Sequence, residues 1–232
     1  MLYLNVLISI VIVSVYLVVK LPKLHQLSPA DARKTLDRWA VHFSYEVLNQ
    51  LLAVGILLFV SAELAHRLFQ FQRQVSFTSV LTVVGVIFFL DFLFYWRHRF
   101  YHRFLMSIHS LHHRDRSFDL TVTFRIHPLE MMVQMLIFLG TIYFFGLDRW
   151  QMVTINIVFT VQAFYSHFEL DFFPERVNRW LAVLFVVPQF HSVHHREKTQ
   201  LHFGFLFCIW DRIFGTLTKE IYEWDIDSNF TS

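Results

Sequence analysis

The chain has 232 residues, of which 55% are hydrophobic and 16% are charged, and its formal net charge at pH 7 is +2. Soluble domains carry about 25% charged residues, so this composition excludes an ordinary soluble protein and indicates an integral membrane protein. The small net charge gives no indication of nucleic-acid binding, and the single cysteine, Cys208, excludes an intramolecular disulfide and a cysteine-rich zinc or iron–sulfur site.

Five apolar stretches have about the length that a helix needs to cross a bilayer, roughly 20 residues. In chain order they cover 2–19, 47–63, 76–96, 129–146 and 149–166. The first begins without a basic segment and lacks a small-residue cleavage pattern before Lys20, so we expect a retained span rather than a signal peptide. The second contains two polar residues, Asn49 and Gln50. The predicted fold is an all-α integral membrane protein with about four to five transmembrane helices.

Lys and Arg positions predict how these helices are oriented. If the N-terminus lies outside and the spans alternate, 17 of the 20 Lys and Arg residues fall on the cytoplasmic side, as the positive-inside rule prefers. Two further apolar segments, 180–188 and 203–214, are too short to cross and are expected at the interface.

Histidines form the most informative pattern in the chain. Ten of the fourteen fall into a spaced series that includes the motif HxxHH twice: His98, His102, His109, His112, His113, His127, His167, His191, His194 and His195. The predicted topology brings all ten to the cytoplasmic face. On a helix, residues at i, i+3 and i+4 share one face, so one HxxHH can give its nitrogens to one metal or divide them between two. Ten imidazoles are enough for two metals and too many for one.

Three acidic residues are candidates for supporting such a site. Asp91 lies inside the third apolar stretch, where an ionisable side chain is a functional candidate, and we expect it to support the ligands or to pack helices. Glu130 and Asp211 are predicted partners for the outer N–H groups of ligating imidazoles.

Several motifs occur in a characteristic order. They are RHRFYH at 97–102, HSLHH at 109–113, FRIHPLE at 124–130, HSVHH at 191–195 and WDRIFGT at 210–216. This series resembles the fatty acid hydroxylase/sterol desaturase superfamily, in particular its bacterial membrane branch, over about 91–217. His202 stands where relatives often carry Asn, so it is either an extra ligand or a substitution that retunes the site.

The resemblance implies a bundle of membrane helices with a cytoplasmic histidine-rich helical cap that holds two iron ions, for which zinc can substitute. The implied ligands are the histidines of the series, with His127 belonging to the family signature, and Trp210, Asp211 and Gly215 matching its last motif. The expected domains are N-terminal transmembrane helices over 1–75, a fatty acid hydroxylase/sterol desaturase-like catalytic domain over 76–220 and a tail over 221–232.

The expected activity is an O2-dependent hydroxylation or desaturation of a lipid C–H bond. The substrate would be a sterol, a fatty acyl chain or another membrane lipid, and the location a bacterial inner membrane. Because the chain shows no haem motif, GxGxxG or cysteine cluster, electrons are expected from a separate ferredoxin, or a cytochrome with its reductase. Two alternatives stay open, namely a histidine-rich membrane zinc hydrolase and a non-enzymatic metal-handling membrane protein.

Overall fold

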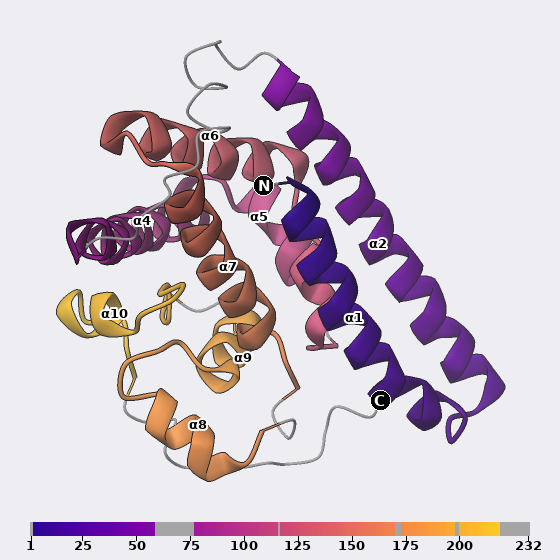
Figure 1. Ribbon diagram of the computed structural model, residues 1–232. Helices are drawn as coiled ribbons and strands as arrows, with labels where there is room; N and C mark the ends of the chain where they lie inside the picture. The colour runs from indigo at the N-terminus through magenta and orange to yellow at the C-terminus, as the bar shows by residue number, and fades with distance from the viewer. Residues whose placement is uncertain (1, 59–76, 116, 170–172, 198–199, 219–232) are drawn as a thin grey trace. The chain divides into compact units, whose positions relative to one another are not determined.

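The computed structural model describes the chain except for residues 1, 59–76, 116, 170–172, 198–199 and 219–232. The described residues are predominantly helical, and their only extended pairing is an isolated bridge between Phe185 and Phe207. The helices are α1 (Leu2–Leu24), α2 (Pro29–Leu58), α4 (Phe77–Phe104), α5 (Met106–His113), η1 (Leu120–Phe124), α6 (Pro128–Phe145), α7 (Arg149–Ser166), α8 (Glu175–Leu181), α9 (Pro188–Glu197) and α10 (Ile209–Ile213) (Figure 1). The prediction of an all-α chain is confirmed for these residues.

The chain divides into two compact units. The first unit contains residues 1–90 and 123–161, and the second contains 91–122 and 162–232. Helices α4 and α7 each begin in the first unit and end in the second. Both HxxHH motifs and the histidines of α4 therefore belong to the second unit.

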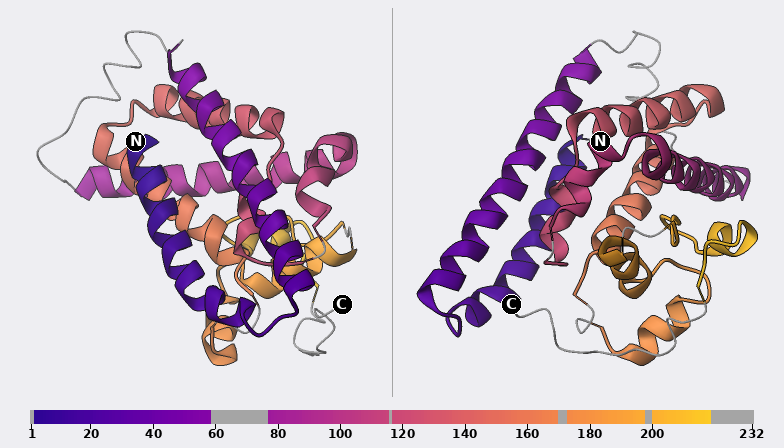
Figure 2. Two further views of the ribbon diagram at one scale, coloured as in Figure 1. Left: turned by 90° about the vertical axis from the view of Figure 1, so that its right-hand side faces the viewer. Right: turned by 180° about the vertical axis from the view of Figure 1, so that it is seen from behind.

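In the first unit, α1 and α2 form a pair that the local sequence defines well (Figures 1 and 2). Ser28 precedes Pro29 at the start of α2, and its Oγ accepts a hydrogen bond from the backbone N–H of Asp31 at 3.2 Å. This is a standard N-cap, with proline at the first helical position. Between the two helices, the rings of Tyr16 and Trp39 lie 5.9 Å apart and are buried.

The link between α6 and α7 also follows from its sequence. Gly146 ends α6 with φ 60°, a left-handed conformation that glycine adopts without strain. Asp148 Oδ1 then accepts from the backbone N–H of Gln151 at 3.1 Å, while Gln151 Oε1 accepts from the backbone N–H of Asp148 at 3.0 Å. This reciprocal pair is a capping box, and it starts α7 at the predicted position.

Two described helices are long and apolar enough to cross a membrane. They are Thr78–Phe104, with mean hydropathy 2.0, and Pro128–Phe145, with mean hydropathy 1.5. They correspond to the predicted spans 76–96 and 129–146. The predicted span 149–166 is helical as α7 but is more polar, with Asn156 and Gln162 along it, and the predicted span 47–63 lies partly outside the described residues. The number of spans and their orientation remain predictions.

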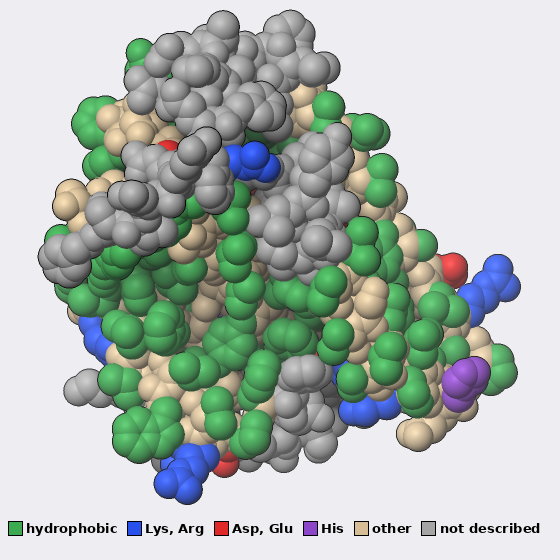
Figure 3. Space-filling model, in the orientation of Figure 1, with side chains coloured by type: hydrophobic (Ala, Val, Ile, Leu, Met, Phe, Trp, Pro, Cys, Tyr) green, Lys and Arg blue, Asp and Glu red, His purple; other side chains and the backbone are tan. Residues whose placement is uncertain are grey.

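Large apolar side chains are exposed on several helices. Val18 of α1, Leu51 of α2 and Phe144 of α6 are 72%, 66% and 79% exposed. Hydrophobic side chains predominate on the described part of the face in view in Figure 3. Such exposure is costly in water and is typical of surfaces that lipid covers.

Candidate metal centre

The second unit gathers nine histidines into two adjacent clusters. The first cluster consists of His98, His102, His109, His113 and His194, and the second consists of His112, His167, His191 and His195. All nine side chains are buried. Within each cluster, one nitrogen from every ring lies within 4.8 Å of the others. The clusters adjoin each other, since the rings of His113 and His195 stack with centroids 4.4 Å apart.

Each HxxHH motif contributes to both clusters. In α5, His109 and His113 are one turn apart and enter the first cluster, whereas His112 enters the second. In α9 the division is reversed. His191 and His195 enter the second cluster, and His194 enters the first. The i, i+4 pair of each motif thus lies in one cluster, and the histidine between them lies in the other. The spacing allowed each motif either to serve one metal or to divide its histidines between two, and the structure shows the divided arrangement.

The distances between ring nitrogens fit ligands that surround a common ion. In the first cluster, Nε2 of His113 lies 3.2 Å from Nε2 of His102 and 3.1 Å from Nε2 of His109. Two nitrogens that are each about 2.1 Å from one ion lie about 3.0 Å apart at a right angle and about 3.4 Å apart at a tetrahedral angle.

The second cluster shows the same spacing. Nε2 of His167 lies 3.3 Å from Nε2 of His112 and 3.0 Å from Nε2 of His191, and Nε2 of His191 lies 3.1 Å from Nε2 of His195. Several buried neutral imidazoles that converge on one point in this way are the donor set of a transition-metal site.

Backbone carbonyls orient three of these rings. Nδ1 of His98 lies 3.1 Å from the carbonyl oxygen of Phe203. Nδ1 of His167 lies 2.8 Å from the carbonyl oxygen of Ala163, and Nδ1 of His194 lies 2.7 Å from that of Leu201. A carbonyl oxygen only accepts, so Nδ1 carries the proton and Nε2 keeps its lone pair for a metal. In His98 and His194 this Nε2 atom is buried without a hydrogen-bond partner.

Burial keeps four of the ligand candidates neutral, namely His167, His191, His194 and His195. It lowers the pKa of His167 to about 4 and holds the pKa of His191, His194 and His195 well below the ordinary value of 6.5. Neighbouring histidines lower the last three further, because each charged ring would repel the next. At neutral pH these rings therefore have the deprotonated nitrogen that metal binding requires.

Asp211 supports the site through the backbone rather than through an imidazole. Its carboxylate accepts hydrogen bonds from the backbone N–H groups of Phe203 and Gly204, each at 2.8 Å, and from Thr216 Oγ1 at 2.7 Å. The structure thus differs from the prediction that Asp211 accepts an outer imidazole N–H. Asp211 instead holds the backbone of Phe203 and Gly204, and the carbonyl oxygen of Phe203 contacts Nδ1 of His98. Burial raises the pKa of Asp211 to about 6.

Asp91 stabilises the next part of the same loop. Its carboxylate accepts from the backbone N–H groups of Leu206 at 2.7 Å and Phe207 at 3.0 Å, and from Nε1 of Trp210 at 2.9 Å. This is a packing role between α4 and the 206–210 segment, one of the two roles expected for Asp91. The sequence did not predict the roles of the carbonyls of Ala163, Leu201 and Phe203, because every residue carries a carbonyl group. The only sequence signal near Leu201 and Phe203 is the glycine of the FGF segment, Gly204.

Three other candidates lie outside both clusters. His127 and Glu130 belong to the first unit, where Nδ1 of His127 accepts from the backbone N–H of Leu129 at 3.2 Å and caps α6, and Glu130 is buried in the first turn. His202 is buried in the second unit, stacks on Phe190, and places Nε2 3.0 Å from Thr218 Oγ1. His202 has φ 57° and is the only described non-glycine residue with positive φ, a conformation that Asn tolerates well.

Comparison with known proteins points to one family. The family model described as fatty acid hydroxylase matches residues 82–216. Similar relatives include very-long-chain aldehyde decarbonylase GL1-4 of Oryza sativa subsp. indica, 29% identical over 58% of this chain and 23% of the relative. Protein CER1-like 1 of Arabidopsis thaliana is 30% identical over the same shares, and alkylglycerol monooxygenase of Caenorhabditis elegans is 24% identical over 65% of this chain and 30% of the relative. The chain thus spans less than a third of each relative's length. No solved structure matches it.

Proposed function

The chain belongs to the fatty acid hydroxylase family, and on this basis we propose that it is a membrane-bound di-iron oxygenase that hydroxylates or desaturates a C–H bond of a lipid. The observation that supports this most directly is the division of nine buried histidines into two adjoining clusters. We assign the catalytic domain to 76–220, preceded by N-terminal transmembrane helices over 1–75 and followed by a tail over 221–232.

In this proposal each cluster holds one iron ion. The first ion would be bound by the five histidines of the first cluster and the second by the four of the second cluster. Imidazole suits iron and zinc, but a catalytic zinc site typically uses three protein ligands, so nine histidines favour two irons over a zinc hydrolase. When bound, the two irons would activate O2 for attack on an unactivated C–H bond, which acid–base groups alone cannot achieve.

The protein's own residues keep the centre ordered and dry. Phe203 is fully buried, and its ring lies 5.3 to 5.6 Å from the rings of His98, His102 and His194. Phe118 stacks on His167 at 5.8 Å in the second cluster. These aromatic rings exclude water from the imidazoles, and the carbonyl contacts hold the rings in one tautomer and orientation.

The substrate class follows from the relatives only as a proposal. The names of the similar proteins refer to very-long-chain aldehydes and to alkylglycerols, both of which carry long hydrocarbon chains. We therefore propose a lipid with a long alkyl or acyl chain, in a membrane that places the centre on the cytoplasmic face. Electrons would come from a separate donor such as a ferredoxin, or a cytochrome with its reductase.

Incubation under ¹⁸O2 tests this function. Membranes from cells that produce the protein, or its His194→Ala variant, would receive a ferredoxin, its reductase and NADPH, and lipids would be analysed by mass spectrometry. We expect ¹⁸O in a lipid hydroxyl group, or loss of two hydrogens from a lipid chain, with the unchanged protein only. Hydrolysis products formed equally under argon would support the zinc hydrolase, and an unchanged lipid profile would support the metal-handling protein; either result would contradict the oxygenase.

A further inference from the structure

His202 has its backbone in the left-handed region, with φ 57°, and among the described residues no other residue except glycine has a positive φ. This conformation is unfavourable for a histidine, and it persists only where the surroundings hold it. The backbone N–H of His202 donates to the carbonyl oxygen of Thr216 at 2.8 Å, and its buried imidazole stacks on Phe190 with ring centroids 5.2 Å apart. Residues strained in this way cluster at functional sites.

The residues on either side of His202 both contact the first histidine cluster. The carbonyl oxygen of Leu201 lies 2.7 Å from Nδ1 of His194, and that of Phe203 lies 3.1 Å from Nδ1 of His98. These two ligand candidates come from α9 and α4, and their ring centroids lie 4.4 Å apart. The segment 201–203 therefore orients two imidazoles of the first cluster at once.

The φ angle of His202 determines whether both contacts can form together. The carbonyl of Leu201 belongs to the peptide group that precedes His202, so rotation about the N–Cα bond of His202 turns this group relative to Phe203. Most residues have φ of about −50° or below, and a return to that range would rotate the peptide group by more than about 100°. The carbonyl of Leu201 would then turn away from His194 while Phe203 stays against His98.

We propose that the left-handed turn at residue 202 positions the ligands of the first metal site, and that it acts through the backbone rather than through the His202 imidazole. By directing both carbonyls, the turn holds Nε2 of His98 and of His194 free for the ion. The His202 ring belongs to neither cluster, so of the two roles expected for it this inference excludes the extra ligand. The inference rests on the metal centre of the proposed function but not on oxygenase activity.

Titration with Co²⁺ alone tests this inference, because imidazole sites bind cobalt as well as iron. The full chain would be purified in detergent, stripped of metal with a chelator and titrated while its visible absorption is recorded. His112→Ala and His113→Ala each remove one ligand candidate from a different cluster, so they identify which spectral change belongs to which cluster. The readout requires neither O2 nor a substrate.

His202→Gly and His202→Ala form the decisive pair. Both remove the imidazole, but only glycine adopts a positive φ without strain. We expect the first cluster to keep its Co²⁺ affinity in His202→Gly and in His202→Asn, and to lose about tenfold or more in His202→Ala. The second cluster should bind Co²⁺ alike in all three. A role in packing alone predicts the opposite order, because alanine leaves the smaller cavity.

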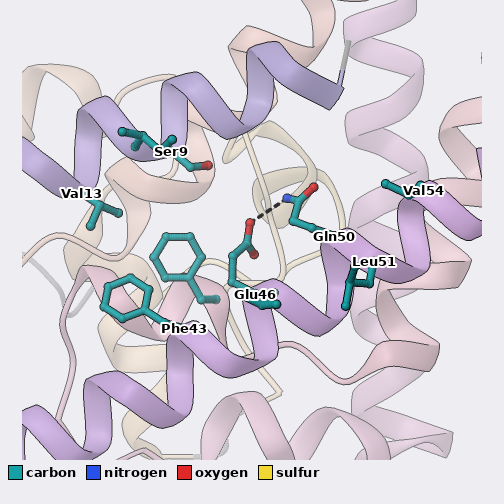
Figure 4. Close-up of a pocket in the computed structure, with 10 residues that line it drawn as sticks. Ser9, Val13, Phe43, Glu46, Gln50, Leu51 and Val54 are labelled. Carbon is teal, nitrogen blue, oxygen red and sulfur yellow. Dashed lines mark hydrogen bonds between the residues drawn. The ribbon is translucent and has the colours of Figure 1, made fainter.

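A substitution in the first unit separates this effect from a general loss of stability. Phe43 lines an apolar groove between α1 and α2 (Figure 4), and its ring lies 5.4 Å from that of Phe124. Phe43→Ala removes this packing and should lower the thermal stability of the protein, yet it should leave both Co²⁺ affinities unchanged. Thermal unfolding of each variant shows that it is folded.

Equal Co²⁺ affinity of the first cluster in His202→Gly and His202→Ala would overturn the inference. Loss of the first ion in both His202→Gly and His202→Asn would also overturn it, since the imidazole itself would then be a ligand. An equal weakening by Phe43→Ala would attribute the effect to stability and have the same consequence. All three results leave the two-metal centre intact, whereas failure of the unchanged protein to bind any Co²⁺ would contradict the metal centre and the inference together.

Discussion

The carbonyl oxygen of Phe203 contacts Nδ1 of His98 at 3.1 Å and so joins positions 105 residues apart in the chain. The backbone N–H of Gly204, which belongs to the same peptide group as this carbonyl, donates to Oδ2 of Asp211 at 2.8 Å. One peptide group thus connects a buried carboxylate to a ligand candidate of the first cluster. Residues that contact no metal can therefore determine how well that cluster is formed.

Asp211→Asn should weaken metal binding in the first cluster. The amide keeps one acceptor, so one of the hydrogen bonds from Phe203, Gly204 and Thr216 is lost and the loop behind His98 loosens. Changes at such supporting groups typically cost about 10- to 100-fold in metal affinity. Metal retention during graded chelation measures the effect, and Asp37→Asn, an exposed position of α2, is the control. Equal retention in both variants would contradict the role given to Asp211.

Gly204→Ala should destabilise the fold. A Cβ at this position would lie 2.6 Å from Asp211 Oδ2 and 2.8 Å from the carbonyl oxygen of Phe207, so the loop must shift. The expected loss is about 1–3 kcal/mol in the free energy of unfolding.

Gly85→Ala in α4 is the matched control for this substitution, because a Cβ there meets no atom within 4 Å. Alanine is a better helix former, so this variant should be neutral or slightly stabilising. Unfolding in mixed micelles with increasing SDS gives both values. A Gly204→Ala variant as stable as Gly85→Ala would show that the loop is not tightly packed.

His202 should make the metal-free protein less stable in acid. Burial lowers its pKa to about 4, while an unfolded histidine titrates near 6.5. As the pH falls below 6.5 the unfolded chain takes up a proton that the folded chain cannot, so the stability present above pH 6.5 is lost toward pH 4.

His202→Asn removes this titration and suits the positive φ of the position. Between pH 7 and pH 5 the variant should therefore lose about 2 kcal/mol less stability than the unchanged chain. Unfolding of the metal-free proteins at both pH values measures the difference. Identical pH dependence would mean that His202 is not buried in its neutral form.

His127→Ala should affect stability without changing metal content. His127 Nδ1 caps α6 at Leu129, and loss of an N-cap typically costs about 1 kcal/mol. Two measurements, the unfolding free energy and the iron content of the purified variant, separate this role from ligation. A fall in iron content with unchanged stability would instead make His127 a ligand.

The helical class and the grouping of the histidines could be predicted from the sequence. The backbone groups that orient the imidazole rings could not. Spacing alone placed the histidines of α5 and α9 on shared faces, but it left open whether each motif serves one ion or two. The answer depends on packing between segments far apart in the chain, which brings His113 against His195. The carbonyls that orient His98 and His194 cannot be recognised from side-chain identity. The range of α7 matches the predicted span 149–166, but its polar residues make the helix less apolar than a typical membrane span.

Metal content per polypeptide tests the central claim most directly. Protein purified from iron-supplemented cells would be analysed by mass spectrometry alongside His112→Ala and His113→Ala, neighbouring positions that belong to different clusters. We predict two irons per chain in the unchanged protein and a loss of about one iron in each variant, from the second and the first cluster respectively. A single metal ion per chain that neither substitution affects would contradict the two-ion centre.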